Sequence, residues 1–419
     1  MSKLKIFPFL GSLCGVLLFV VDPSTAQTVK IRLFEIFQPR CLEIYAEAGQ
    51  FSANSAARHF RENTKNGLFI AAANAPLFDT PQSWTRITLT SSTLQIQSAG
   101  GNCSLPLADT VRISASGEAY WAAAPIPHEA ERRTSRASFP VRPYTGTLQI
   151  YVDGNELAVI NLVPVADYLA GILAAEMPQA ELPAWQAQAV VSRTYMTKNW
   201  QRHAKDGYQF CDLTHCQTYK GIAGVTSTIR QAVASTADEI LTFDEQPIEA
   251  YYSSTCGGTT ADDVGVWANG IDQPYLKSIA DESFCSSSPH YRWRARIAAD
   301  SLHQLWQRRL GESIHSVWIT KKGADGRVRE LALMGTSLHL INGEDFRAVT
   351  CRAFGWNTLK STAFDLRFEK KYYIFNGRGL GHGLGLCQYG AMEMARRGYS
   401  YREIVLRYFS EVKIRKCEK

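Results

Sequence analysis

The fold is decided by residues 148–178, which read LQIYVDGNELAVINLVPVADYLAGILAAEMP. Two runs rich in Leu, Ile and Val flank Asp153-Gly154, a pair that supplies the positive φ angle of a tight hairpin turn. Apolar residues then recur with helical spacing between 168 and 173, and Pro178 restricts the preceding backbone and ends the helix. The stretch predicts a β-hairpin that leads directly into a helix.

Period-two alternation marks the region before this hairpin. Thr, Ile and Val alternate with other residues over 85–90, 93–97 and 110–114, which predicts half-buried strands. The segment 128–138 is polar and charged, which is typical of a solvated linker or loop. We therefore expect a β-rich N-terminal module over residues 27–140.

Helical and strand patterns interleave irregularly after the hairpin. Pro183 is tolerated in a first helical turn and begins an Ala-rich helical pattern that runs toward His203. A further helix is expected over 226–237, followed by a strand over 239–243. The expected fold class is α+β, with a mixed catalytic domain of interleaved strands and helices over residues 141–419 behind the small β-rich module.

The first residues have the pattern of a secretory signal peptide. Lys3 and Lys5 precede an apolar run over 6–21, which is shorter than the ~20 residues needed to span a bilayer. Small residues lead up to Ala26, where signal peptidase would cut. We expect residues 1–26 to be a signal peptide and the mature protein to be periplasmic or otherwise extracytoplasmic.

The composition of the 419 residues is that of a globular protein. Hydrophobic residues make up 45% and charged residues 20%, which argues against a disordered or fibrous chain. Lys and Arg number 45 against 39 Asp and Glu, and the net charge of +6 is too weak to predict nucleic acid binding. A mild positive charge suits an anionic polymer such as cell-wall glycan.

Nine of the ten cysteines lie outside the expected signal peptide. In an oxidising compartment disulfides are the ordinary expectation, and the odd number leaves at least one thiol free. The stretch FCDLTHCQTY at 210–219 gathers Cys211, His215 and Cys216, with His203 as a further possible ligand of a tetrahedral zinc site. A Cys211–Cys216 disulfide is the alternative, and the sequence leaves both open.

Glu176 is the first candidate for chemistry. It stands in the last turn of an apolar helix, where the negative end of the helix dipole and the apolar neighbours would both raise the pKa of its carboxyl. A raised pKa lets a carboxylic acid donate a proton near neutral pH. Asp167 lies too far along the same helix to act as a second carboxylate, so the spacing favours a one-carboxylate mechanism. An ordinary exposed helix-end Glu is the alternative.

Two Gly-rich stretches offer ligand contacts. GRGLGHGLGLCQYG at 377–390 lets the backbone approach a ligand and presents His382 between two glycines, where its imidazole could orient a hydroxyl or move a proton. The stretch lacks the βαβ context of a dinucleotide-binding loop, so we exclude dinucleotide binding as its function. YYSSTCGGTT at 251–260 reads as a strand that ends in a polar turn, whose hydroxyls and aromatics could line a sugar groove. Each stretch could equally be an ordinary turn.

Taken together and in this order, five motifs resemble those of the stage II sporulation protein D family (SpoIID/LytB domain). They are VPVADYLAG with AEMP at 163–178, QAQAVVSRTY at 186–195, THCQTYKG at 214–221, CGGT at 256–259, and GLGHG through QYGA at 379–391. The likeness spans about residues 142–414, and the chain has Cys387 where relatives often have Ser.

The resemblance implies an exported peptidoglycan lytic transglycosylase. Such an enzyme cuts glycan strands between N-acetylmuramic acid and N-acetylglucosamine, prefers denuded strands, and has an N-acetylmuramoyl-L-alanine amidase as its expected functional partner. The resemblance places the catalytic acid at Glu176 and implies that Cys211 and Cys216 help hold a structural zinc ion, with His203 or His215.

The remaining expected site residues would position the sugar. They are Arg193, Tyr252, Ser254, His382, Gln388 and Tyr389. The alternative function is a non-catalytic glycan-binding module or an amidase activator, which would bind glycan without cutting it. A cysteine or zinc hydrolase is disfavoured, because the sequence contains neither a serine nucleophile elbow nor a His-Glu-x-x-His helix.

Overall fold

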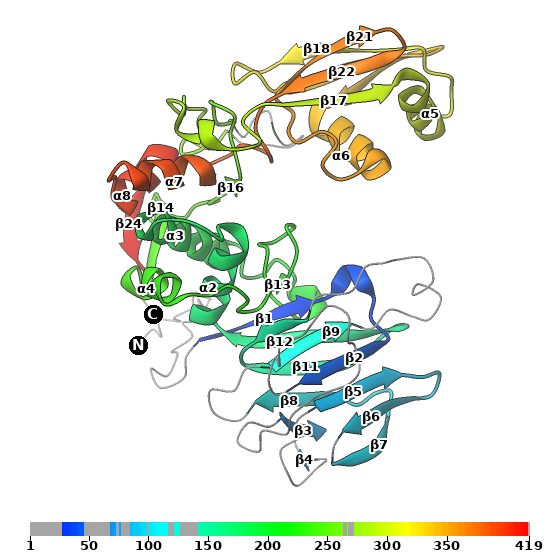
Figure 1. Ribbon diagram of the computed structural model, residues 1–419, viewed down its shortest axis with the longest axis vertical. Coiled ribbons are helices and arrows are strands. Elements are labelled where there is room, and N and C mark those ends of the chain that lie inside the picture. Colours follow the sequence, from blue (N-terminus) through cyan, green and yellow to red (C-terminus); the bar gives the residue numbers. More distant parts are fainter. Residues whose placement is uncertain are drawn as a thin grey trace, which may run out of the picture.

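A computed structural model of the chain describes residues 27–45, 68–72, 75–76, 84–98, 100–115, 121–125, 141–262, 266 and 272–417. The expected signal peptide and the polar segment 128–138 lie outside the described residues. Figure 1 shows a layer of strands at one end, a group of helices beside it, and a second unit of strands and helices at the other end. The predicted α+β class is confirmed.

Two sheets build the N-terminal layer, and their strands are antiparallel except for the parallel pair of β1 and β13. The seven-stranded sheet has the order β13-β1-β12-β11-β8-β3-β4, and the six-stranded sheet has the order β10-β9-β2-β5-β6-β7. The strands are β1 Thr28–Leu33, β2 Cys41–Tyr45, β3 Leu68–Ala72, β4 Ala75–Pro76, β5 Trp84–Leu89, β6 Thr93–Ser98, β7 Gly101–Pro106, β8 Val111–Ala115, β9 Trp121–Pro125, β10 Arg142–Tyr144, β11 Thr147–Asp153, β12 Glu156–Pro164 and β13 Phe210–Cys211.

The predicted hairpin is confirmed as β11 and β12, with Gly154 at a φ of 61° in its turn. The strands that pair with this hairpin do not respect the domain boundary that the sequence predicted. β12 pairs with β1 in the register Val29↔Val163, and β11 pairs with β8, so one sheet crosses the boundary predicted at residue 140. Alternation reveals a strand but not its partner, which is why the sequence placed the boundary inside a sheet.

Helices pack against this layer around the central helix α3, which contacts α2, α4, α7 and α8. Their bounds are α2 Val165–Glu176, α3 Leu182–Lys198, α4 Ser227–Ser235, α7 Gln388–Arg396 and α8 Tyr401–Tyr408. The helix expected to run toward His203 ends earlier, at Lys198. Within the described part of the chain, every helix is too short or too polar to cross a bilayer.

The helical region also contains short strands. A three-stranded sheet has the order β15-β14-β24, with β14 Glu239–Phe243, β15 Gln246–Pro247 and β24 Lys413–Lys416. β16 (Tyr252–Ser253) pairs in parallel with β23 (Leu386–Cys387). This second pair joins segments that are far apart in the sequence, and it lies beside the residues discussed below.

Between β16 and β23 the chain forms a unit with its own core, which the sequence did not reveal. Leu302, Trp306, Phe346 and Phe375 are buried in that core. Its elements are β17 Trp293–Ala298, α5 Ala299–Leu310, β18 Ser316–Lys322, β19 Val328–Met334, β20 Leu338–Asn342, α6 Gly343–Phe354, β21 Phe364–Glu369 and β22 Tyr372–Gly377. Figure 1 shows them at the end opposite the N-terminal sheets, so residues 141–419 hold more than one core.

The middle of α2 lies against the turn that follows β13. A Cβ added at Gly171 would collide with the carbonyl oxygen of Gly221 and lie 2.7 Å from the ring of Tyr219. Tyr219 is fully buried, its ring packs edge-on against Tyr168 at 5.2 Å, and its hydroxyl donates to Asn161. The absent side chain at Gly171 therefore sets the distance between α2 and this turn.

We predict that Gly171→Ala destabilises the protein. Helix propensity alone would make the variant about 1 kcal/mol more stable than the parent. Overpacking a filled contact, however, destabilises a folded protein by about 1–3 kcal/mol. The measurement is the free energy of unfolding in urea. Ala166→Gly at an exposed position of the same helix is the matched control, expected to lose about 1 kcal/mol through propensity alone. A Gly171→Ala protein as stable as the parent would contradict the packing argument.

Candidate active site

Glu176 is the last residue of α2, and its carboxylate is half-buried. The main-chain N–H of Thr218 donates to Oε1 at 2.9 Å, and the side-chain amide of Gln388 lies 3.5 Å from Oε2. Thr218 belongs to the turn held by Gly171, whereas Gln388 is the first residue of α7. The carboxylate is thus contacted from two separate segments.

Tyr252 stands close to this carboxylate. Its hydroxyl donates to Oε1 of Gln217 at 3.1 Å. Burial, followed by the charge of Glu176, raises the pKa of the Tyr252 phenol well above its usual range, so the phenol remains protonated. The parallel pairing of β16 with β23 sets Tyr252 opposite Leu386, two residues before Gln388.

Ser254 and Tyr389 meet at the same strand pair. The main-chain N–H of Tyr389 donates to the carbonyl oxygen of Ser254 at 3.1 Å, and the hydroxyl of Ser254 lies 3.3 Å from that of Thr255. Both Ser254 and Tyr389 are half-buried. The β16–β23 pair therefore brings Tyr252, Ser254, Gln388 and Tyr389 together, and Gln388 contacts Glu176 directly.

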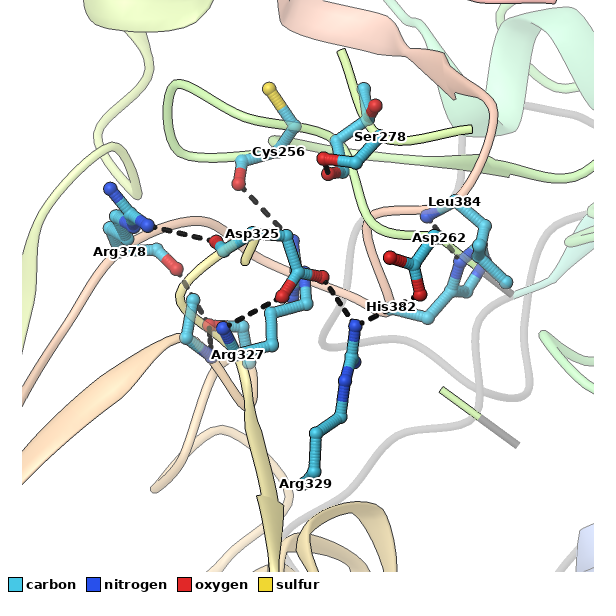
Figure 2. Close-up of polar contacts among 12 residues, drawn as sticks. Cys256, Asp262, Ser278, Asp325, Arg327, Arg329, Arg378, His382 and Leu384 are labelled. Carbon is cyan, nitrogen blue, oxygen red and sulfur yellow. Dashed lines mark hydrogen bonds and ion pairs between the residues drawn. The ribbon is translucent and has the colours of Figure 1, made fainter. Parts of the chain in front are cut away.

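His382 lies in the Gly-rich turn before β23. Its Nδ1 accepts from the main-chain N–H of Leu384 at 3.0 Å, a contact that Figure 2 shows, and its ring lies edge-on to Tyr251 at 6.0 Å. Burial, together with the positive charges of Arg327 and Arg347, lowers the pKa of His382 to about 4. The imidazole is therefore neutral at pH 7.

Arg193 does not take the position expected of a sugar contact. Its guanidinium is buried and donates to the carbonyl oxygens of Thr236 at 2.7 Å, Glu239 at 3.0 Å and Val233 at 3.3 Å. Burial lowers its pKa to about 10. These contacts tie α3 to the end of α4 and the start of β14, so we assign Arg193 a packing role. A sequence motif cannot distinguish an arginine that faces a ligand from one that caps a helix end.

The two other carboxylates considered from the sequence lie away from this arrangement. Asp167 is in the first turn of α2 and pairs with Arg230 at 2.6 Å, while Thr145 donates to its second oxygen. Glu181 is exposed just before α3. The contacts of Glu176 are therefore with neutral donors, which suits a group that both gives and takes a proton.

The candidate zinc residues form one cluster. His203, Cys211, His215 and Cys216 each bring one ligand atom within 4.8 Å of the others. Cys216 Sγ lies 3.4 Å from His203 Nε2 and 3.7 Å from His215 Nδ1, and Cys211 Sγ lies 3.8 Å from His215 Nδ1. The edge between sulfur and nitrogen in a tetrahedral zinc site is about 3.6 Å, so the spacing fits such an ion. Both histidines lie in the cluster.

The surroundings of this cluster also fit a cation. The hydrogen bond between the two thiols is the main cause that lowers the pKa of Cys211 and raises the pKa of Cys216. Asp206 lies 3.2 Å from Nδ1 of His203, which is the carboxylate–histidine arrangement that orients metal ligands. Arg202 lies 3.1 Å from Nε2 of His215. If Nδ1 of His215 bound a metal, Nε2 would carry the ring proton and could not accept from Arg202, so this exposed arginine side chain would turn away.

The cluster stands at the base of the segment that reaches Glu176. Residues 211–216 lead directly into Gln217 and Thr218, whose contacts with Tyr252 and Glu176 are described above. Gln217 and Thr218 belong to the motif at 214–221, but the sequence predicts no role for either residue. A main-chain donor such as the N–H of Thr218 carries no residue-type signal, so only the fold could identify it.

Comparisons with known families match two parts of the chain. The family described as "Stage II sporulation protein" matches residues 153–243, which include Glu176 and the whole zinc cluster. A domain of unknown function, DUF8618, matches residues 283–385, close to the unit with its own core.

Individual relatives extend over more of the chain. It is 30% identical to stage II sporulation protein D of Bacillus subtilis over 288 residues, which is 65% of this chain and 80% of that protein. It is 28% identical to stage II sporulation protein D of Bacillus amyloliquefaciens over 303 residues, 68% of this chain and 84% of the relative. An amidase enhancer of B. subtilis is 27% identical over 285 residues, 58% of this chain and 39% of that protein. The chain therefore belongs to the stage II sporulation protein D family.

Proposed function

We propose that this protein is an exported lytic transglycosylase that cleaves the bond between N-acetylmuramic acid and N-acetylglucosamine in denuded peptidoglycan strands. The observation that carries the proposal is the position of Glu176, a half-buried carboxylate that faces the amide of Gln388 and the main chain of Thr218. Membership in the family supports a role in the cell wall, and the mild positive charge suits an anionic glycan.

The proposed reaction needs one carboxyl group that acts twice. Protonated Glu176 donates its proton to the glycosidic oxygen as the bond from that oxygen to C1 of the muramic acid breaks. The resulting carboxylate then takes the proton of the muramic acid 6-hydroxyl, whose oxygen bonds to C1 and closes a 1,6-anhydro ring. Because the nucleophile belongs to the substrate, neither water nor a second carboxylate is required.

The neighbouring groups have supporting roles in this proposal. Thr218 and Gln388 orient the carboxylate, and both can donate to it when it is ionised. Tyr252, Ser254 and Tyr389 line the approach to it and contact sugar hydroxyls. His382 is neutral at pH 7 and acts as a positioning group rather than a source of protons.

We also propose that His203, Cys211, His215 and Cys216 hold a zinc ion, because their spacing and donor set fit tetrahedral coordination. All four positions are taken by protein ligands, which is typical of structural rather than catalytic zinc. When bound, the ion would cross-link the segment that leads to Thr218. The residues of the chain alone then contact the sugar.

A second candidate function is favoured by the similarity to a protein named amidase enhancer. In that case the same surface would bind glycan and promote the work of an N-acetylmuramoyl-L-alanine amidase without cutting the strand. Sedimentation with glycan measures binding, and product analysis measures cleavage, so the two functions give different results.

We predict that Glu176→Gln abolishes glycan cleavage. The amide keeps the size of the side chain but cannot donate the acid proton, and losing a general acid costs about 10²–10⁴-fold in rate. Mass spectrometry of products from denuded glycan should show anhydro ends with the parent protein and a matching loss with the variant. Glu181→Gln, at an exposed position close in sequence, is the control and should retain activity.

The outcomes separate the two functions. Full activity of Glu176→Gln would contradict the catalytic assignment. Glycan binding by the parent with no cleavage, while amidase turnover rises in its presence, would favour the amidase activator. Products with reducing ends instead of anhydro ends would show that water replaces the 6-hydroxyl.

We predict that Cys216→Ser removes one zinc ion and destabilises the protein. Serine is a poor zinc ligand, and a metal that binds only the folded state stabilises it by about 3 kcal/mol at 100-fold excess over its dissociation constant. The measurements are metal content by plasma mass spectrometry and the unfolding midpoint. Cys103→Ser, outside the cluster, is the control; equal zinc content and stability in parent and Cys216→Ser would refute the site.

A further inference from the structure

A second cluster of thiols lies at the β16–β23 strand pair. Cys256 follows β16, Cys285 lies in a 3-10 helix at Phe284–Ser287, and Cys387 ends β23. These three side chains and that of Asp281 are each 0–1% exposed. Four potential metal ligands from three segments of the chain are thus enclosed together, and the proposed reaction does not use them as a group.

The spacing of the cluster fits an ion better than a disulfide. One ligand atom from each of the four residues lies within 4.8 Å of the others, and the sulfurs of Cys256 and Cys285 are 3.5 Å apart. Two sulfurs on a tetrahedral zinc ion are about 3.8 Å apart, whereas a disulfide holds them at about 2.05 Å. A disulfide between Cys256 and Cys285 would also leave the Cys387 thiol and the Asp281 carboxylate without a common ligand.

The groups around the cluster favour negative charge on its sulfurs. The main-chain N–H of Cys256 donates to the Cys387 sulfur at 3.2 Å, and Cys387 stands at the N-terminus of the nine-residue helix α7. Figure 2 shows the guanidinium of the fully buried Arg327 reaching the carbonyl oxygen of Cys256, at 3.2 Å. These donors would stabilise thiolates more than thiols.

Asp281 is held in place for ligation. Its Oδ1 accepts from the hydroxyl of Tyr408 at 2.6 Å, and its Oδ2 accepts from the main-chain N–H of Cys285 at 2.7 Å. Each carboxylate oxygen has a second lone pair, so these bonds leave Asp281 able to bind an ion. Hydrogen-bonded carboxylate ligands are the usual arrangement in metal sites.

We propose that Cys256, Cys285 and Cys387, with Asp281, bind a second zinc ion. Binding converts three thiols to thiolates and releases three protons, and Zn²⁺ with three thiolates and one carboxylate carries a net charge of −2. The positive end of α7 and the guanidinium of Arg327 offset that charge. Three thiolates select zinc over the hard cations Mg²⁺ and Ca²⁺.

The bound ion would restrict the position of Gln388, the residue after the ligand Cys387. Cys387 immediately precedes Gln388, whose amide faces Glu176, and Cys256 lies two residues after Ser254. The second zinc therefore cross-links both strands of the β16–β23 pair to the segment of Asp281. The proposal concerns metal content and does not depend on whether the protein cuts glycan.

Metal content of the full mature chain tests this proposal. Protein purified with reductant, saturated with Zn²⁺ and exchanged into metal-free buffer should contain two zinc ions per chain. Cys211→Ser/Cys216→Ser removes the first cluster and should leave one ion, surrounded by three sulfurs at about 2.3 Å in X-ray absorption. Cys387→Ser should lose the second ion, whereas Cys351→Ser, a buried cysteine outside both clusters, should keep both.

The parent chain decides the question if a variant does not fold. Two ions with five sulfur ligands in total, two at the first cluster and three at the second, support the second site. A single ion in the parent, or a Cys256–Cys285 disulfide in a non-reducing peptide map of the zinc-saturated protein, overturns it. Retention of two ions by a folded Cys387→Ser protein with unchanged sulfur coordination overturns it as well.

Discussion

The candidate site depends on how closely the first helix of the family domain approaches the turn behind it. Gly171 has no side chain, and this allows α2 to contact Gly221 and the ring of Tyr219. Only at that distance does the main chain of Thr218 reach the carboxylate at the end of α2. The hydroxyl of Tyr219 and the side chain of Asn161 continue the contact into β12, so the N-terminal sheets and the site share one support.

The second contact of Glu176 comes from a distant part of the chain and has its own support. Gln388 begins α7 directly after the β16–β23 pair, and Cys387 takes part in the thiol cluster that we propose to bind zinc. The cluster of His203, Cys211, His215 and Cys216 likewise comes shortly before Thr218 in the chain. Each of the two segments that contact Glu176 therefore follows a group of candidate metal ligands, and ions bound there would restrict its movement without lying beside the sugar.

Local patterns predicted much of this arrangement. The Asp153-Gly154 turn, the end of α2 before Pro178 and the proximity of the candidate zinc ligands Cys211, His215 and Cys216 follow from residue type and spacing, because each depends on neighbours in sequence. The pairing of β12 with β1, the core over 293–377 and the burial of Arg193 depend on long-range contacts, which a single sequence does not display. Asp281 and Cys285 were missed for the same reason, since they stand outside the quoted motifs and join the cluster only through the fold.

The long segment of chain between β16 and β23 has a consequence for biosynthesis. β16 cannot pair with β23 until residues 254–385 have been made, and closing so long a loop is entropically costly unless the intervening unit is already compact. Gln388 follows that unit, so a nascent chain that has not yet reached this residue lacks one of the two contacts of Glu176. Residues up to Gln388 must therefore have been made before both contacts of Glu176 can form.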